Sequence, residues 1–308
     1  MMDFLLKHSK AILITSTVLV IVSVISVIAF GFNLGIDFTS GSLWQVRMTG
    51  VETSDLRNFF AEEFGIEELN IAIDQSENIY ALTLREITEH ERQEILTAMK
   101  ERFGEVEDLD FSTISPSISS ELKGKAYTAI ALVMVGISLF IAFAFRKVSE
   151  PIKSWKYGVI TLITLIHDVV IPAGVFVYLG KFAEVGIDIN FIVAMLFVMG
   201  FSVHDTIVVF DRIRENLLIV KEEKKRQPLQ EIVNRSIKET VARSINTSLT
   251  LVLILITLFF FGPISTKMFV FAILIGTIAG TYSSIFFASP LLVFAERFSR
   301  NPHGQFKS

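Results

Sequence analysis

Six long apolar runs constrain this chain more than any other feature of its sequence. A helix needs about 20 predominantly apolar residues to cross the hydrocarbon core of a bilayer, and each run approaches or exceeds this length. The runs predict an α-helical polytopic membrane protein with six transmembrane helices, and they exclude a soluble enzyme. They cover Ala11–Phe30, Ala126–Phe145, Tyr157–Leu179, Ile189–Phe210, Ile245–Phe261 and Phe269–Phe294.

The first run stands where a secretory signal would stand, and Lys7 and Lys10 precede it. It is longer than the apolar core of a signal peptide, which has about 7–15 residues, and Gly31–Gly35 is a poor small-residue cleavage site. We therefore interpret the first run as an uncleaved span.

Lys and Arg residues are distributed unevenly among the short connections. The loop Arg146–Lys156 carries four of them and Asp211–Ser244 carries nine, whereas Gly180–Asp188 and Gly262–Met268 carry one each. Positively charged loops stay on the cytoplasmic side of a membrane. We therefore expect both termini in the cytoplasm and residues 32–122 outside it.

Residues 32–122 form an acidic block, with 19 Asp and Glu but only six Lys and Arg. This balance argues against nucleic acid as a partner of the block. Its strand and helix patterns follow the order β-α-β-β-α-β, which is the ferredoxin-like arrangement. The expected elements are Ser42–Met48, Thr53–Phe64, Asn70–Asp74, Ile79–Leu84, Thr88–Phe103 and Val106–Ile114.

The chain therefore divides into four predicted parts. They are an N-terminal cytoplasmic tail with the first span (1–31), an external, periplasmic α+β domain (32–122), a five-helix membrane domain (123–298) and a cytoplasmic tail (299–308).

The segment Pro228–Ser244, just before the fifth run, has apolar residues at helical spacing and a polar opposite face. This pattern predicts a cytoplasmic amphipathic helix. The helix either lies along the membrane surface or simply connects the loop to the fifth span.

Two His-Asp pairs interrupt the apolar runs, His167-Asp168 in the third and His204-Asp205 in the fourth. At a rise of ~1.5 Å per residue, Asp168 lies roughly 16 Å and Asp205 roughly 8 Å from the cytoplasmic end of its helix. A carboxylate in the bilayer is costly unless it faces protein or water, so both pairs are candidate functional sites. The simpler interpretation of Asp205 is a hydrated carboxyl group near the interface. Pro172, four residues after Asp168, predicts a local opening of the third helix.

Arg243 lies just before the fifth run, at a depth from which its guanidinium approaches Asp205. Proton exchange on Asp205 would then make or break this pair. One charge moved across the membrane field is worth about 2.3 kcal/mol per 100 mV, enough to drive a conformational step. The alternative is a permanent structural ion pair. Asp211, Arg212 and Arg214 are expected to form a solvated face where the fourth helix leaves the membrane.

Small residues recur four apart in the last run, where Gly276 and Gly280 form a GxxxG motif. Such a face permits close contact between helices, either inside the bundle or with another subunit. The chain has no Cys, so disulfides and cysteine-ligated metal sites are excluded.

Several segments together resemble the SecF family, whose members are membrane subunits of the bacterial Sec protein-export machinery and relatives of the RND proton-driven transporters. The resemblance covers the whole chain. The sister family, SecD, has a much larger external region, so SecF is preferred. The matching segments are Gly35-Ile36-Asp37-Phe38-Thr39 with Gly41, the pair His167-Asp168, the stretch from Gly200 to Asn216, and Arg243-Ser244-Ile245-Asn246-Thr247-Ser248.

The chain departs from the family's pattern at two positions. Ser40 stands where the family commonly has Gly, and His204 stands where it commonly has Asn. The first departure predicts a slightly different turn. The second places another titratable group beside Asp205.

The resemblance also implies partners and a function. A SecF-type chain pairs with SecD in a twelve-span unit and associates with the SecYEG channel, and often with YajC and YidC. It uses the proton motive force to assist late, ATP-independent export of unfolded polypeptides. Protons are the coupling ion, and no other cofactor, metal or nucleic acid is expected. The chain would be a multi-pass transport subunit, not an enzyme, in contact with the lipid of the bacterial cytoplasmic membrane.

Within this resemblance, Asp205 and Arg243 are the residues expected to couple protons. The positions expected to support them are Asp168, His167 and His204. Asp37 is expected to be structural, holding the link between the first span and the external domain, and Gly35, Gly41 and Gly200 belong to the same motifs. Two other functions stay open: a subunit of an RND-type small-molecule exporter, and a scaffold of the channel that transduces no energy.

Overall fold

The computed structural model describes residues 9–74, 77–146, 152–224 and 227–299. Lys7 and all but the first residue of the predicted tail 299–308 lie outside the described residues. The chain divides into two compact units. A helical unit comprises Met1–Ala29, Ala129–Val175 and Phe191–Ser308, and a mixed unit comprises Phe30–Thr128 and Phe176–Asn190.

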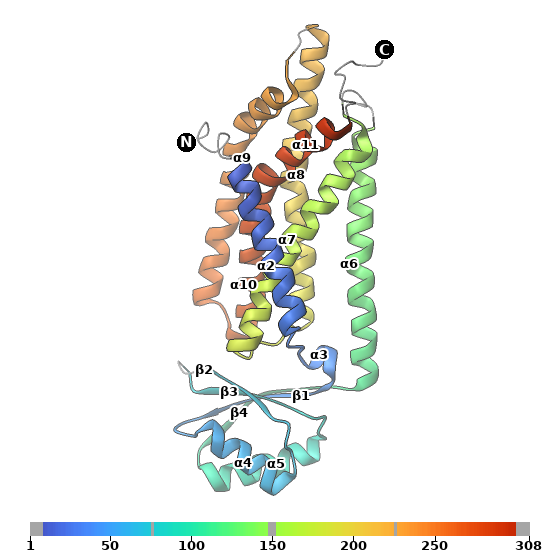
Figure 1. Ribbon diagram of the computed structural model, residues 1–308. Helices are drawn as coiled ribbons and strands as arrows, with labels where there is room; N and C mark the ends of the chain where they lie inside the picture. Colours follow the sequence, from blue (N-terminus) through green and yellow to red (C-terminus); the bar gives the residue numbers. More distant parts are fainter. Residues whose placement is uncertain (1–8, 75–76, 147–151, 225–226, 300–308) are drawn as a thin grey trace. The chain divides into compact units, whose positions relative to one another are not determined.

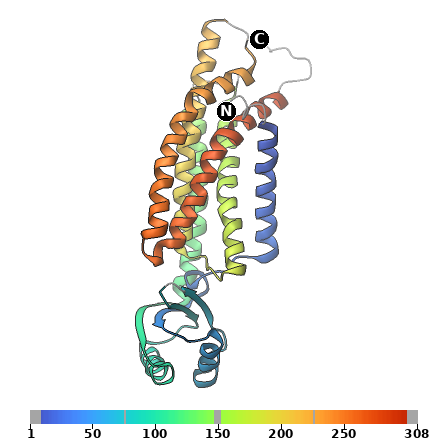
Figure 2. The same cartoon turned by 90° about the vertical axis from the view of Figure 1, so that its left-hand side faces the viewer.

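Six helical segments among the described residues are long and apolar enough to cross a membrane, which confirms the predicted fold class. Within the helical unit they run side by side (Figures 1 and 2). Helices satisfy their own backbone hydrogen bonds, which is why apolar runs of this length adopt them in lipid. The segments are α2 (Ser9–Phe30), α6 (Pro116–Ala144), α7 (Ser154–Phe182), α8 (Ile189–Glu222), α9 (Leu229–Phe261), and α10 (Ile264–Ser283) continued by η1 (Ser284–Ala288) and α11 (Ser289–Ser299).

The predicted amphipathic segment Pro228–Ser244 is not a separate helix. Helix α9 begins at Leu229 and runs unbroken into the fifth span. Its apolar side chains, among them Ile232, Ile237 and Val241, are buried in the core of the helical unit. Protein therefore covers the apolar face that a membrane-surface helix would turn towards lipid, and the segment is a connecting extension of the span.

The last span contains a π-helical segment, η1, which the sequence reasoning missed. Pro290 follows η1 and has no N–H with which to bond the carbonyl four residues earlier. A π-segment at this point accommodates the lost hydrogen bond. Helix α7 continues across Pro172, so the opening predicted there does not interrupt the helix.

The mixed unit contains a four-stranded antiparallel sheet in the order β2-β3-β1-β4. Helices α4 and α5 cover the same face of this sheet (Figures 1 and 2). This arrangement confirms the predicted ferredoxin-like domain. Its elements are β1 (Gly41–Met48), α4 (Thr53–Phe64), β2 (Asn70–Asp74), β3 (Ile79–Leu84), α5 (Glu89–Phe103) and β4 (Val106–Ile114).

Local sequence explains the two helices of the α+β domain. Thr88 caps α5 by accepting a hydrogen bond from the Glu91 amide, as the capping pattern predicts. Gly65 ends α4 in the left-handed conformation that glycine adopts without strain. Between helices and sheet, a core that includes Trp44 and Phe60 is fully buried.

Candidate functional site

Asp168 is completely buried in the helical unit, and both of its carboxylate oxygens are hydrogen-bonded. Oδ1 lies 2.8 Å from His167 Nδ1, and Oδ2 accepts a hydrogen bond from the Ser202 hydroxyl of α8. His167 Nε2 is hydrogen-bonded to the hydroxyl of Ser16 in α2. A carboxylate only accepts, so a neutral His167 donates from Nδ1 and accepts from Ser16. The Asp168 centre therefore joins α2, α7 and α8.

The π-helical segment also contributes to this centre. The ring of Phe287 stacks on the His167 imidazole, with ring centroids 4.7 Å apart and planes inclined by 24°. Helices α7 and η1 thus hold the imidazole between an aromatic face and a carboxylate.

Asp205 is also buried, with 2% of its surface exposed, but its surroundings differ. The Ser248 hydroxyl of α9 lies 3.3 Å from Asp205 Oδ2. Thr281 of α10 donates in turn to Ser248, at 2.7 Å. Among the described residues, the Asp205 carboxylate is hydrogen-bonded to the Ser248 hydroxyl and forms no ion pair with a Lys or Arg side chain. The carboxylate is therefore bonded by one neutral hydroxyl of α9, which is bonded in turn by a hydroxyl of α10.

The GxxxG motif brings α10 against α8 of the same chain. A Cβ atom added at Gly276 would lie 2.3 Å from Val198 Cγ2, and one added at Gly280 would lie 3.0 Å from Ser202 Cβ. Ser202 is the residue that bonds Asp168. The motif therefore faces the inside of the bundle, next to the first carboxylate.

The predicted approach of Arg243 to Asp205 is not observed in the described part of the chain. Arg243 is exposed and lines a cavity of about 370 Å³ between α8 and α9. His204 and Gly200 are also exposed, and nothing lies within 4 Å of a Cβ added at Gly200. These two residues lie one turn apart on α8, on a face that the rest of the helical unit leaves uncovered.

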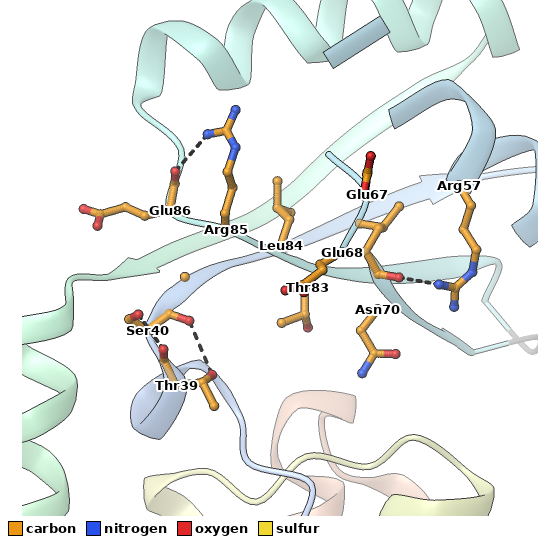
Figure 3. Close-up of a pocket in the computed structure, with 12 residues that line it drawn as sticks. Thr39, Ser40, Arg57, Glu67, Glu68, Asn70, Thr83, Leu84, Arg85 and Glu86 are labelled. Atoms are coloured by element: carbon orange, nitrogen blue, oxygen red, sulfur yellow. Dashed lines mark hydrogen bonds between the residues drawn. The ribbon is translucent and has the colours of Figure 1, made fainter. Parts of the chain in front are cut away.

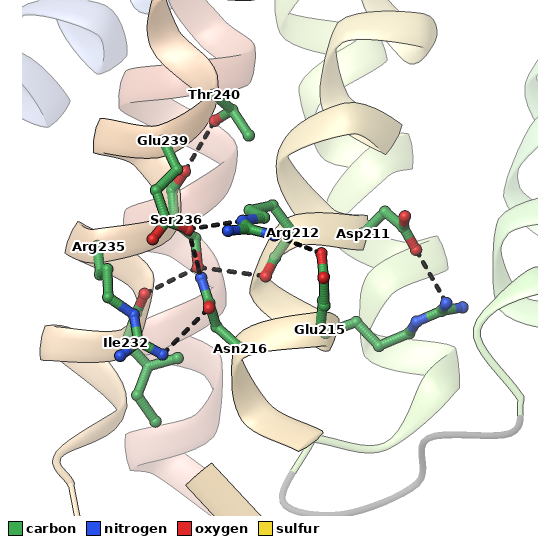
Figure 4. Close-up of polar contacts among 10 residues, drawn as sticks. Asp211, Arg212, Glu215, Asn216, Ile232, Arg235, Ser236, Glu239 and Thr240 are labelled. Atoms are coloured by element: carbon green, nitrogen blue, oxygen red, sulfur yellow. Dashed lines mark hydrogen bonds and ion pairs between the residues drawn. The ribbon is translucent and has the colours of Figure 1, made fainter. Parts of the chain in front are cut away.

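Residues where α8 leaves the apolar region form a network between helices, not only a solvated face (Figure 4). Arg212 bonds Glu239 of α9 and Glu215, each at 2.6 Å. The buried amide of Asn216 donates to Glu239 at 2.8 Å, so one carboxylate of α9 joins two residues of α8.

Asp211 lies on a solvated face, as the sequence predicts, whereas Arg212 bonds a neighbouring helix. Asp211 is 55% exposed and pairs with Arg214 on its own helix at 3.1 Å. The sequence reasoning assigned no role to Glu239 or Asn216. For Asn216, the one sequence feature that could have indicated a role is its place at the end of the long motif that begins at Gly200.

A buried ion pair between α7 and α11 was also missed. Lys156 Nζ lies 2.7 Å from Glu296 Oε2, and less than a tenth of each side chain is exposed. The sequence reasoning counted Lys156 as a loop cation, but it belongs to helix α7 and is buried. Glu296 lies 140 residues away in sequence, so no local pattern indicates the pairing.

The motif after the first span connects two loops of the mixed unit. The Gly35 amide donates to the Ile187 carbonyl at 2.8 Å. Asp37 Oδ2 accepts a hydrogen bond from the Ile189 amide, also at 2.8 Å. Ile189 is the first residue of α8, so Asp37 caps the start of that helix from a distant part of the chain.

Position 41 accommodates glycine only, because of its backbone conformation and a close neighbouring carbonyl. Its φ is +123°, and a Cβ there would lie 2.5 Å from the Leu84 carbonyl oxygen. Ser40, where the family commonly has Gly, has a φ of +65°, in the region that favours glycine.

The α+β domain contains an open cavity of about 560 Å³ beside the start of β1 (Figure 3). In its wall, Arg57 donates to the Leu69 carbonyl at 2.6 Å. Among the described residues, no group of three or more His, Asp or Glu side chains is placed to hold a metal ion.

Comparison with known proteins places these features in a family. Residues 94–297 match the family model described as protein export membrane protein SecD/SecF, C-terminal, and residues 25–49 match the SecD/SecF GG motif. The protein translocase subunit SecF of Thermobaculum terrenum is 42% identical over 301 residues, covering 94% of this chain and 92% of the relative. The SecF of Sebaldella termitidis is 31% identical and covers 97% and 93%.

A solved structure shows the same fold. The crystal structure of SecDF, a translocon-associated membrane protein from Thermus thermophilus, matches with a TM-score of 0.82 and 33% identity. The match covers 96% of this chain but 38% of that chain, so this chain spans less than half of the SecDF length. Family model, full-length relatives and fold agree, and the chain belongs to the SecD/SecF family of protein-export membrane proteins, as a member of SecF type.

Proposed function

We propose that this multi-pass membrane subunit, which has a SecF-type role in protein export, couples proton movement to export through Asp205. The observation that carries the proposal is the setting of this carboxylate, which is buried inside a six-span chain and bonded by the Ser248 hydroxyl, which Thr281 bonds in turn. Hydroxyl groups can bond both an ionised and a protonated carboxyl, because they donate and accept. A permanent guanidinium partner would instead favour the ionised form alone.

The Asp168 centre serves as a support in this proposal. Each oxygen of its carboxylate has a hydrogen-bond partner, His167 for one and Ser202 for the other. Such a saturated buried network fixes the geometry of the helices that carry it. We assign it the positioning of α8, the helix that also carries Asp205.

The exposed polar residues of α8 and α9 are assigned to a partner subunit. His204 and Arg243 would be costly against lipid, so they are expected to face protein or a water-filled space. Gly200 on the same face permits close approach of another helix. SecD is the proposed partner, because the SecDF of Bacillus subtilis contains a segment like this chain in 37% of its length.

The remaining assembly follows the same proposal. We assign the chain to the bacterial cytoplasmic membrane, with both termini in the cytoplasm and the α+β domain outside. There it would work with SecD and the SecYEG channel, and with YajC and YidC, on unfolded polypeptides in late, ATP-independent export. The positively charged loop Asp211–Ser244 supports this orientation.

The decisive experiment measures completion of export in membrane vesicles after ATP is removed, with and without a proton gradient. Asp205→Asn is expected to abolish the response to the gradient while the protein still assembles. Asp110→Asn, at an exposed acid of the α+β domain, is the matched control and keeps the response. A full gradient response in Asp205→Asn would refute the proposal and favour the scaffold function, in which that variant changes stability only.

A further inference from the structure

We propose that Ser248 and Thr281 are positioning residues that transmit the protonation state of Asp205 to helix α10. The inference rests on the proposed function, in which Asp205 exchanges a proton. It concerns the step after that exchange, in which the charge on Asp205 of α8 changes the hydrogen bonds of α10.

The three side chains form a line across three helices. Asp205 belongs to α8, Ser248 to α9 and Thr281 to α10. Asp205 and Ser248 are buried, and Thr281 is half-buried. The hydroxyls therefore exchange few hydrogen bonds with solvent and depend on one another.

Each hydroxyl has two acceptors within reach but only one proton to donate. Ser248 Oγ lies 3.3 Å from Asp205 Oδ2 and 2.8 Å from the Ser244 carbonyl of its own helix. Thr281 Oγ1 lies 2.7 Å from Ser248 Oγ and 2.8 Å from the Thr277 carbonyl of its own helix. The same heavy atoms therefore support two hydrogen-bond patterns.

The charge on Asp205 selects between the two patterns. An ionised carboxylate only accepts, so Ser248 donates to it and Thr281 donates to Ser248, in a chain strengthened by the charge. A protonated carboxyl can itself donate to Ser248, which then turns its proton to the Ser244 carbonyl. Thr281 loses the charge-assisted partner, and its proton returns to the Thr277 carbonyl. The hydroxyls keep their own protons throughout, so they sense the charge and do not conduct protons.

Helix α10 is suited to respond at this point. Gly280, next to Thr281, packs on Ser202, which bonds the other buried carboxylate. The Ser283 hydroxyl donates to the Gly280 carbonyl at 3.0 Å, and the π-segment η1 begins at the following residue. π-segments are local irregularities often found at functional sites. One turn of α10 thus contacts both carboxylate centres and leads into the irregular part of the span.

Other titratable groups on the helices packed around α8 stay unchanged in the test. His204 is the neighbour of Asp205 on α8, Arg243 stands on α9, and Tyr282 stands on α10. On α7, His167 and Asp168 are linked to α8 through Ser202. None of these residues is changed in the variants below.

The test compares Thr281→Val, which keeps the shape of the side chain but removes the hydroxyl, with Thr281→Ser, which restores it. Thr257→Val is the control, because Thr257 is exposed on α9 and, among the described residues, its hydroxyl donates to the Leu253 carbonyl of its own helix. Gradient-driven export is measured in vesicles over a series of pH values. We expect Thr281→Val to lower the gradient response roughly fivefold, as loss of one hydrogen bond worth about 1 kcal/mol suggests, and to change its pH profile. Thr281→Ser and Thr257→Val keep the wild-type profile.

A second measurement does not depend on export. Hydrogen–deuterium exchange of residues 277–289 is compared between the wild type and Asp205→Asn, whose side chain is permanently neutral. We expect a difference in that segment, and we expect Thr281→Val to abolish it while Thr281→Ser keeps it.

The outcomes separate the two proposals. If Asp205→Asn keeps its gradient response, the proposed function fails and this inference fails with it. If Asp205→Asn loses the response but Thr281→Val keeps both the wild-type pH profile and the exchange difference, only the inference is overturned. A Thr281→Val protein that fails to assemble is replaced by Ser248→Ala, for which the same results are expected.

Discussion

At the scale of single residues, Ser40 and Gly41 show how the segment after the first span depends on backbone conformation. Ser40 adopts a positive φ directly before Gly41, whose own position tolerates no side chain. The sequence comparison with the family singled out Ser40 as a departure, and the backbone explains why Gly is common there.

Ser40→Gly is expected to stabilise the α+β domain by about 1 kcal/mol, because relief of backbone strain, about 1–3 kcal/mol, exceeds the entropic cost of glycine in the unfolded chain, about 0.4–1 kcal/mol. The gain would appear as a higher urea midpoint of the purified chain, followed by the fluorescence of the buried Trp44. Ser112→Gly, at an exposed position of strand β4, is the control and should lower the midpoint, since glycine weakens a strand. An equal effect of both changes would contradict the strain argument.

At the scale of elements, the sequence predicted most of what local patterns determine. The six spans follow from apolar runs, and the order of strands and helices in the α+β domain follows from alternation and capping. The unbroken course of α9, the π-segment and the Arg212–Glu239 contact were not predicted, because they depend on which helix packs against which. The candidate sites show the same difference between local and packing-dependent features. The sequence identified Asp168 and Asp205 as carboxyl groups inside the spans, but it did not identify their hydroxyl partners on other helices.

The crossing of α8 and α10 gives a prediction about packing. Gly276→Ala should destabilise the protein by about 1–3 kcal/mol, because the new Cβ would collide with Val198. Gly136→Ala in α6 is the matched control, since nothing lies within 4 Å of its added Cβ. That change should be neutral or stabilising by up to about 1 kcal/mol. Thermal unfolding in detergent measures both, and a stable Gly276→Ala protein would contradict the close contact.

The first turn of α5 gives a prediction about pH. Hydrogen bonding to Arg92, and then to Gln93, lowers the pKa of the Glu89 carboxyl to about 2. A carboxyl whose pKa falls on folding adds stability above its unfolded pKa, about 4.3, and loses this contribution as the pH falls towards 2. Glu89→Gln should therefore flatten the decline of the urea midpoint between about pH 4.5 and pH 2.

Trp44 fluorescence in a Trp155→Phe background reports on the α+β domain alone, since the chain has two Trp residues. Glu62→Gln, at an exposed acid of α4, serves as the control and should leave the pH dependence unchanged. A decline of the same steepness in Glu89→Gln and the wild type would rule out this contribution.

At the scale of the whole molecule, buried polar groups recur along the helical unit and not at one point only. The Lys156–Glu296 pair joins α7 to α11, the Asp168 centre lies farther along α7, and the Asp205 centre joins α8, α9 and α10. A chain that transmits conformational change needs both fixed and adjustable contacts. The ion pair belongs to the fixed kind, because neither partner has ready access to water.

Lys156→Met should destabilise the protein by about 3–5 kcal/mol, since it leaves the Glu296 carboxylate buried without its cation. The double variant Lys156→Met with Glu296→Leu should recover most of the loss, because both charges are then removed. Thermal unfolding of the single and the double variant measures both changes in stability. Equal stability of the single and double variants would show that the pair is not coupled.

The cap that Asp37 places on α8 has a consequence for the backbone at the start of that helix. Asp37 stands four residues before β1, an inner strand of the sheet, and its carboxylate holds the first amide of a membrane-spanning helix. This hydrogen bond ties the first residue of α8 to the short segment that leads into β1. Removing the Asp37 carboxylate would therefore deprive that amide, one of those that a helix start cannot bond internally, of its acceptor.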